Sequence, residues 1–349
     1  MQRIILLLTL LLPYLAVKGQ DNPVLKQFQK SKLLTSTIVP VKSDNLGEVV
    51  DLVVLDSVLV VTEMFTPQLY KLFDVKSGKL LKACISKGRG PNELQFPLVM
   101  TKNSGDSFSV FESSKNQLIY LSLKDLLSDH PHFTRKETVN NRSLKLYPLG
   151  NSQYVGTGIF EKGRFCLFDK KTNQSETFLE YPKEGAPSGT NNIALGMAYQ
   201  ASLSVHPNKD RFVVVCGSCP NMEICKIEQN KIISHKSTLF NTPIFKVQGN
   251  NVAFSSENLY AFNSLASSDK YIFTIYAGKS RKEHGSAFYS GRDLLVFDWN
   301  GNPIIDLKLD RDVYRMCFNE AENEIVAYSI NAETAEPEII SYKLPSELK

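Results

Sequence analysis

Residues 69–85, "LYKLFDVKSGKLLKACI", decide the fold, because copies of this stretch recur along the chain. The stretch begins with an apolar run typical of a β-strand, turns at the polar residues 76–78 and continues as a second strand. Similar units start at Phe165 ("FCLFDKKTNQSETFLEY") and Leu294 ("LLVFDWNGNPIIDLKL"), and a looser copy starts at Glu223. The chain is therefore predicted to repeat one β-hairpin unit.

An aspartate follows the phenylalanine in each clear copy. Asp74, Asp169 and Asp298 lie 95 and 129 residues apart. These spacings fit two and three units of about 43 to 48 residues, a period typical of four-stranded β-propeller blades. Capping of the hairpin turn accounts for the recurring aspartate without any catalytic role.

The hairpins divide the chain into blades. Five are predicted near 49–90, 96–140, 143–182, 196–240 and 259–310, whereas a sixth over 313–344 offers only three strands. The lone strand "TSTIVPVKS", residues 35–43, can supply the fourth, because its pairing closes the ring and removes exposed strand edges. The sequence therefore predicts an all-β, six-bladed β-propeller with the N-terminal strand closing the last blade.

The N-terminus, "MQRIILLLTLLLPYLAVKGQ", has one early positive charge, Arg3, followed by an apolar run over 4–17. As a helix this run spans only about 21 Å, less than the roughly 30 Å hydrocarbon core of a membrane. The pattern predicts a cleaved signal peptide over 1–19, then a lead-in over 20–34 and the propeller over 35–349. We expect an exported protein, periplasmic or extracellular, without membrane insertion.

The formal net charge of +4 falls to +2 when Arg3 and Lys18 are removed with the signal peptide. No basic stripe interleaved with aromatic residues is present in the sequence. These features argue against a nucleic-acid partner, and we expect a monomer.

Cys84, Cys166 and Cys317 alternate with apolar residues in strand-like runs, which predicts buried thiols. The other three cysteines, at 216, 219 and 225, leave two alternatives open. They are either free thiols or include a disulfide, which export permits. The C-x-x-C spacing at 216–219 lacks the helix of a redox motif and the second half of a zinc site.

The stretch "SKGRGPNELQFP", residues 86–97, links the outer strand of the first blade to the inner strand of the second. Gly88 and Gly90 permit positive φ, Glu93 can accept hydrogen bonds from backbone amides, and Phe96 can wedge between blades. A phosphate cradle needs a helix after the glycines, but a strand follows here. An architectural role is predicted, with a ligand contact as the alternative.

The run "GRGPNELQFP" resembles the G-x-G-P-x-E-F-x-x-P connector of NHL-type six-bladed propellers, with Leu94 in place of the phenylalanine. With the signal peptide, the length and the F-D-x-x-(x)-G-K hairpins, the chain resembles TolB-like six-bladed propeller proteins exported by Bacteroidetes-type bacteria. The resemblance covers essentially the whole mature chain. It implies the fold and a ligand face at the mouth of the channel, and it carries little further functional information.

Two connections at that mouth supply the candidate ligand-binding residues, which are charged, amide, imidazole or phenolic. These candidates are Arg89, Asn92, Glu93, Arg281, His284, Tyr289 and Arg292. The basic loop over 276–292 is either a clamp for an anion or acidic glycan, or a solvated loop. In the connection over 181–200, Met197 and Tyr199 either pack or touch a ligand.

The sequence shows neither a G-x-S-x-G nucleophile elbow nor a D-x-D-x-D-G metal loop, so no catalytic residue, metal or cofactor is predicted. We expect an exported, non-enzymatic binding module or scaffold for a protein, peptide or carbohydrate. The alternative is a lyase or hydrolase acting on an acidic glycan or lactone. It requires Arg281, Arg292 and His284 to converge with a carboxylate, Glu63 or Glu93.

Overall fold

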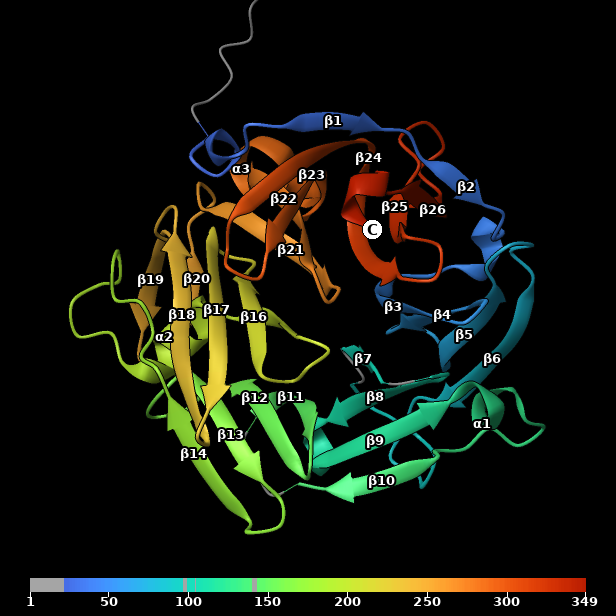
Figure 1. Cartoon of the computed structure of the whole chain (residues 1–349), viewed down its shortest axis with the longest axis horizontal. Helices are drawn as coiled ribbons and strands as arrows, with labels where there is room; N and C mark the ends of the chain where they lie inside the picture. Colours follow the sequence, from blue (N-terminus) through green and yellow to red (C-terminus); the bar gives the residue numbers. More distant parts are fainter. Residues whose placement is uncertain (1–21, 97–98, 104, 140–142) are drawn as a thin grey trace, which may run out of the picture.

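Six blades of mainly antiparallel strands stand in a ring around a central axis (Figure 1). The computed structural model describes residues 22–96, 99–103, 105–139 and 143–349, so the predicted signal peptide lies outside the described residues. Within each blade the strands run in chain order from the axis to the rim, except that the N-terminal strand lies outermost in the last blade. The six-bladed propeller predicted from the recurring hairpins is confirmed.

The first four blades each hold four consecutive strands. They are β3 (Val49–Leu55), β4 (Val58–Glu63), β5 (Gln68–Asp74) and β6 (Leu80–Ser86); β7 (Met100–Lys102), β8 (Ser107–Glu112), β9 (Gln117–Ser122) and β10 (Arg135–Thr138); β11 (Ser143–Gly150), β12 (Gln153–Gly158), β13 (Phe165–Asp169) and β14 (Gln174–Phe178); and β15 (Ala201–Val205), β16 (Arg211–Cys216), β17 (Asn221–Glu228) and β18 (Lys231–Leu239).

The last two blades share one long strand. Blade five contains β21 (Leu259–Ser267), β22 (Tyr271–Ser280), β23 (Gly291–Asp298) and the first half of β24 (Pro303–Asn319); blade six contains the second half of β24, then β25 (Glu324–Ile330) and β26 (Pro337–Lys343). The sequence suggested a break near 311, but β24 runs through it. Lys308 pairs with Asp293 in blade five, and Val313 pairs with Ser329 in blade six.

The N-terminal strand closes the ring, as predicted. Strand β2 (Thr37–Val39) pairs antiparallel with β26, with Val39 opposite Ile339. An unpredicted strand, β1 (Ser31–Leu34), pairs in parallel with β24 on the outside of blade five. Both strands lie along the rim beside the last two blades (Figure 1).

The recurring aspartates cap turns, as predicted. Asp74 Oδ1 accepts a hydrogen bond from the Ser77 amide at 2.7 Å. Asp169 Oδ1 accepts one from the Lys171 amide at 2.8 Å, and Asp298 Oδ1 accepts one at 2.8 Å from the amide two residues further on. These carboxylates replace backbone acceptors in tight turns, which accounts for their recurrence.

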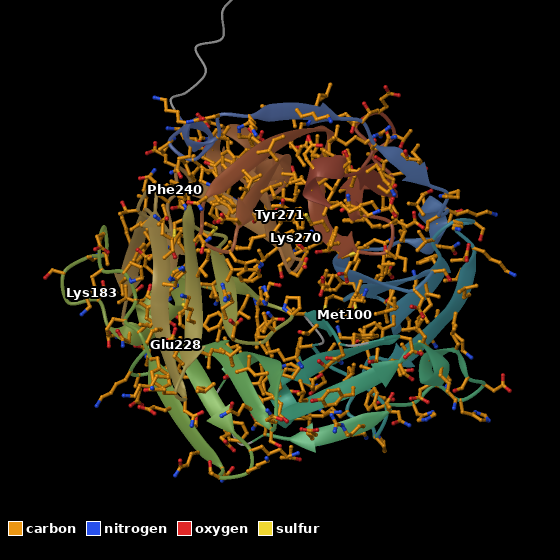
Figure 2. All side chains as sticks on the ribbon, in the orientation of Figure 1. Met100, Lys183, Glu228, Phe240, Lys270 and Tyr271 are labelled. Carbon is orange, nitrogen blue, oxygen red and sulfur yellow. The ribbon has the colours of Figure 1, made fainter. Side chains whose placement is uncertain are left out.

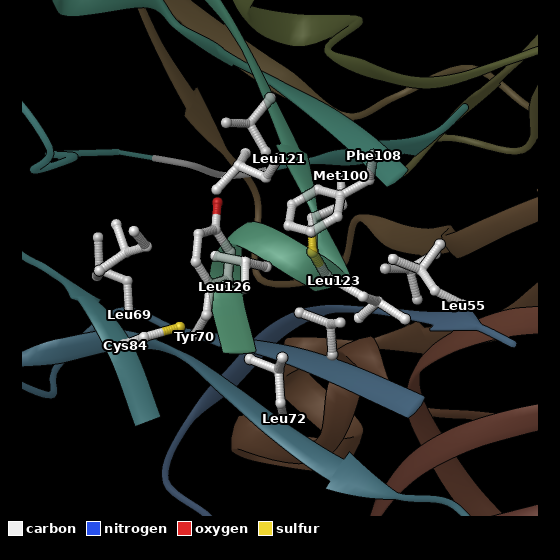
Figure 3. Close-up of a cluster of buried hydrophobic side chains, with 14 of the residues drawn as sticks. Leu55, Leu69, Tyr70, Leu72, Cys84, Met100, Phe108, Leu121, Leu123 and Leu126 are labelled. Carbon is white, nitrogen blue, oxygen red and sulfur yellow. The ribbon is translucent and has the colours of Figure 1, made fainter. Parts of the chain in front are cut away.

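The core lies between the blades. Among the described residues, six hydrophobic clusters each join two neighbouring blades, and together they complete the circuit of the ring. Between blades one and two, the rings of Tyr70 and Phe108 meet edge to face with centroids 5.5 Å apart (Figure 3). Side chains fill the spaces between the ribbons (Figure 2). Packing between blades is therefore the main source of stability.

Short segments interrupt the blade pattern. They are the hairpin β19 (Phe245–Gln248) and β20 (Asn251–Phe254), the helices α1 (Leu123–Leu127), α2 (Asn192–Ala198) and α3 (Arg281–His284), and the 3-10 turns η1 (Leu25–Gln27), η2 (Ser43–Asn45), η3 (Ser113–Lys115), η4 (Gly285–Tyr289) and η5 (Ser346–Leu348). All six cysteines are buried free thiols.

Candidate functional site

One face of the ring carries every predicted site residue. We call it the connector face. It consists of the connections between blades, 40–48, 87–96, 179–200 and 240–258, and of the turns between second and third strands, 64–67, 113–116, 159–164, 217–220, 281–290 and 331–336. The remaining turns of each blade form the opposite face.

The connector 87–96 is built around Glu93. Its Oε2 accepts a hydrogen bond from the Gly90 amide at 2.7 Å, and a Cβ added to Gly88 would lie 2.0 Å from the same oxygen. Gly88 and Gly90 permit positive φ, but neither is among the described residues that adopt it. A side chain at position 88 would have to displace the Glu93 carboxylate, so glycine leaves room for this carboxylate.

A carboxylate that the sequence analysis missed holds this connector in place. Glu112, at the end of β8, is fully buried, and its Oε2 accepts hydrogen bonds from the amides of Gln95 at 2.6 Å and Phe96 at 3.0 Å. Glu63, at the end of β4, plays the same part in blade one, where Oε1 accepts the Gly47 amide at 2.7 Å. The position at the end of a second strand could have revealed both residues.

The connector's outer side chains point to solvent. Arg89 and Asn92 are exposed, and Phe96 is 48% exposed, so the prediction that Phe96 wedges between blades is wrong. Its backbone amide is held by Glu112, whereas its ring remains accessible. The connector therefore has an architectural backbone and an exposed side-chain surface.

The basic stretch 276–292 is ordered as strand, helix and 3-10 turn rather than as a long loop. Arg292 Nε donates to Asp312 Oδ2 at 2.8 Å, and Lys279 Nζ donates to Oδ1 of the same carboxylate at 2.7 Å. Burial alone would raise the pKa of Asp312, but the bonds to Lys279 and Arg292 hold this pKa below its usual value. Arg292 is thus held in an ion pair, although it shares the single carboxylate of Asp312 with Lys279. Arg281 stacks over Phe288 at 5.6 Å, and His284 is exposed.

Tyr289 belongs to a row of aromatic rings that crosses blades five and six. It contacts Phe288 at 5.0 Å and Tyr314 at 5.5 Å between centroids, and the row extends through Phe288 to Tyr260 at 4.2 Å and through Tyr314 to Tyr328 at 6.1 Å. Tyr289 is 39% exposed, so it presents the accessible edge of this row.

The predicted site residues form two separate groups. Arg89, Asn92 and Glu93 lie between blades one and two, whereas the other four lie on blade five. Within the described residues, no hydrogen bond or ion pair joins the groups. Glu63 and Glu93 bind backbone amides. The convergence required by the hydrolase or lyase alternative is not found among these side chains.

Exposed apolar side chains concentrate on the connector face. Those on this face are Phe65, Phe96, Ile244 and Tyr289, with Leu144 and Ile330 at the strand ends that border it; those elsewhere are Leu127 on the opposite face and Leu33, Ile38, Leu81 and Ile233 on the rim. The connector face therefore holds all the exposed aromatic rings among the described residues. Aromatic rings exposed on one face are available to a binding partner.

Three charged side chains on innermost strands each reach the next blade. Asp51 Oδ2 accepts the Met100 amide at 2.6 Å, Lys145 Nζ donates to the carbonyl of Ala201 at 3.0 Å, and Arg315 Nε donates to that of Val50 at 2.9 Å. Figure 2 places Met100 toward the middle of the ring. Burial raises the pKa of Asp51 to about 6, although the amides and cations near it oppose the shift. These hydrogen bonds join blade one to blade two, blade three to blade four, and blade six to blade one.

A pocket opens on the connector face between blades three and four. Its walls include Lys145 from β11, Arg164 before β13, Tyr181 from the connection 179–200, and Tyr199 after α2. Helix α2 positions this wall, since its N-cap Asn191 accepts the Ala194 amide at 2.9 Å. Tyr199 is buried, and burial raises its pKa.

His206 has a structural role between two blades. His206 Nδ1 accepts the Asn208 amide at 3.0 Å, and its ring meets Trp299 edge to face at 4.8 Å. Within the described ranges, no group of three or more His, Cys, Asp or Glu side chains is arranged to hold a metal ion. Among the same residues, no helix has the length and apolar character needed to cross a membrane.

The family model for TolB-like 6-blade propeller-like proteins matches residues 28–321. The chain belongs to this family. The predicted resemblance is thereby confirmed. A search of the curated proteins found no match to this TolB-like propeller.

Two solved structures share the fold of this TolB-like propeller. One is a member of the DUF4221 family from Bacteroides vulgatus, with a TM-score of 0.59, 10% identity, and coverage of 88% of this chain and 95% of that chain. The other is from Bacteroides fragilis and bears the name "Putative exported protein", with a TM-score of 0.54, 10% identity, and coverage of 89% and 98%. At this identity the likeness concerns the fold alone.

Proposed function

We propose that this protein is an exported, non-enzymatic binding module that holds a protein, peptide or carbohydrate ligand on its connector face. The observation that carries this proposal is the concentration of exposed apolar groups there, with Phe65 76%, Phe96 48% and Tyr289 39% exposed. Large rings exposed on a rigid scaffold bury much area on binding at a low cost in side-chain entropy.

The engagement of the charged side chains supports binding rather than chemistry. Arg292 and Lys279 both pair with Asp312, and Glu63 and Glu93 accept hydrogen bonds from backbone amides. A general acid or base needs a free side chain within reach of the substrate, so these groups serve the architecture of the face. The complete circuit of pairing through β2 supports a monomer, because it pairs the strands of the last blade within one chain.

Export is supported by the apolar N-terminal run over 4–17 after Arg3. The name of the Bacteroides fragilis structural neighbour agrees with it. We place the mature protein in the periplasm or outside the cell.

The experiment compares two triple variants on arrays of peptides and glycans. The first variant carries Phe65→Ser, Phe96→Ser and Tyr289→Ser. The control carries Leu81→Ser, Leu127→Ser and Ile233→Ser, whose side chains are each 39% exposed but lie off the connector face. The control removes exposed apolar side chains away from the connector face, although less surface in total, since Phe65 and Phe96 are 76% and 48% exposed.

Ligands that bind the wild type and the control but lose at least tenfold in affinity with the first variant support the proposal. Ligands that bind all three proteins equally, or lose affinity only with the control, overturn it. Circular dichroism and urea unfolding check that both variants remain folded.

A further inference from the structure

We infer that the pocket between blades three and four receives the carboxylate group of a small ligand, with Lys145 and Arg164 as its cationic partners. This inference rests on the proposed function, since it names the chemistry recognised at one place on the connector face. It makes no use of the seven residues predicted from the sequence.

Arg164 is a buried cation with unused hydrogen-bond donors. It is 5% exposed, and its guanidinium lies 4.7 Å from the ring centre of Phe165 and 5.8 Å from that of Tyr181. Nη1 donates to Glu223 Oε2 at 2.6 Å, and the guanidinium makes no other hydrogen bond to a described residue. A guanidinium carries five N–H donors in one plane. The two rings and Glu223 therefore hold the guanidinium of Arg164 in place, and its other N–H donors can bind an acceptor that enters the pocket.

Lys145 lines the same pocket. Its Nζ donates to the Ala201 carbonyl at 3.0 Å, and within the described chain it forms no ion pair. An ammonium has three donors, so two remain. Burial lowers the pKa of Lys145, and the charge of Asp51 offsets part of that shift. Among the described residues that line the pocket, Lys145 and Arg164 are the only charged ones, so an entering anion meets two cations.

The size of the pocket limits what can enter. The cavity holds about 40 Å³, room for about three water-sized groups. A carboxylate has three heavy atoms, whereas a phosphate has five. Gly196 forms part of the wall, where an added Cβ would lie 3.1 Å from the Tyr181 hydroxyl oxygen. Leu144, 46% exposed, stands at the opening, so the body of the ligand would lie outside on the connector face.

A planar carboxylate suits this arrangement, because the edge of a guanidinium binds such a group through parallel N–H donors. A sugar acid and a carboxylate-terminated amino-acid derivative both present it. The experiment therefore uses three carboxylates, acetate, D-glucuronate and N-acetyl-alanine, each beside its own neutral amide. Affinities come from titration calorimetry and ligand-observed NMR.

We expect the carboxylates to bind at least tenfold more tightly than the amides, since hydrogen bonds to charged groups are the stronger ones. Lys145→Met should weaken carboxylate binding about tenfold or more. Leu144→Glu, at an exposed position where folding is not at risk, should weaken it by charge repulsion. Lys162→Met removes an exposed lysine from the turn 159–164 and should bind as the wild type does. The preferred carboxylate identifies the source of the group.

Carboxylates that bind no better than their amides, or that bind Lys145→Met and Leu144→Glu as well as the wild type, overturn the inference. The proposed function has a separate test. If array ligands still depend on Phe65, Phe96 and Tyr289 while the carboxylate preference is missing, the inference fails and the binding function stands. If no ligand depends on those rings, the proposed function fails on its own evidence.

Discussion

Replacing Glu112 with alanine should release the connector 87–96 from blade two. The carboxylate is fully buried, and it accepts the amides of Gln95 and Phe96 and the hydroxyl of Ser114, the last at 2.7 Å through Oε1. Each hydrogen bond to a charged group contributes about 1.5 to 3 kcal/mol. Because water can reach the partly exposed connector and replace some of these bonds, we expect a total loss of about 3 to 5 kcal/mol of unfolding free energy.

Two measurements check this value. Urea unfolding gives the change in stability, and hydrogen exchange of the peptide 86–96 reports whether its amides lose protection. Glu112→Gln keeps an oxygen that can accept both connector amides, so it should lose less than half as much as alanine. Glu161→Ala, an exposed carboxylate on the turn 159–164, should change stability by less than about 0.5 kcal/mol.

The reasoning is refuted if Glu112→Ala costs less than about 1 kcal/mol, below the value of a single hydrogen bond to a charged group. Unchanged exchange of the connector amides would refute it as well. Either result would mean that the connector is held by packing and not by this carboxylate.

Three further outcomes follow from the structure. Arg315→Ala should lower the unfolding free energy by about 1 to 3 kcal/mol in urea titrations, because the bond to Val50 joins blade six to blade one; no loss would contradict that role. Burial raises the pKa of Asp51 to about 6, whereas its pKa in the unfolded chain is about 3.9. The contribution of protonated Asp51 to the unfolding free energy is therefore fully present below pH 4 and is lost as the pH rises through 6. Urea titrations should therefore show that the unfolding free energy of Asp51→Asn, relative to that of the wild type, rises by about 2 to 3 kcal/mol between pH 4 and pH 7. A difference that stays constant over this range would contradict the raised pKa. Alkylation should modify none of the cysteines in the folded protein and all six after unfolding. If only four cysteines are modified after unfolding, the protein contains a disulfide, and Cys216 and Cys219 are the first pair to examine.

The fold could be predicted because its determinants are local and repeated. Each hairpin carries its own turn residues, and Asp74, Asp169 and Asp298 cap their turns through neighbouring amides. The closing strand β2 could also be inferred, because the last blade lacked one strand. The continuous strand β24 escaped prediction, since the polar residues near 311 resemble a turn although they bridge two blades.

The candidate site was harder to predict, because its determinants are contacts between distant residues. Arg164 meets Glu223 across 59 positions, and Lys145 meets Ala201 across 56. Nothing next to Lys145 in the sequence marks it as a residue of the pocket. Arg292, by contrast, lies in a basic stretch whose composition is typical of an anion clamp, but its partner Asp312 lies 20 residues further on. Residue type identified the charged groups, and only the packing of the blades shows which of them are already paired.

The central claim is that ligand binds on the connector face. Hydrogen exchange measured by mass spectrometry, with and without the tightest ligand from the arrays, tests it most directly. The account predicts protection in the peptides 86–96, 159–164 and 281–290, with unchanged exchange in the turns of the opposite face at 56–57, 170–173 and 299–302. Protection confined to the opposite-face turns would contradict it.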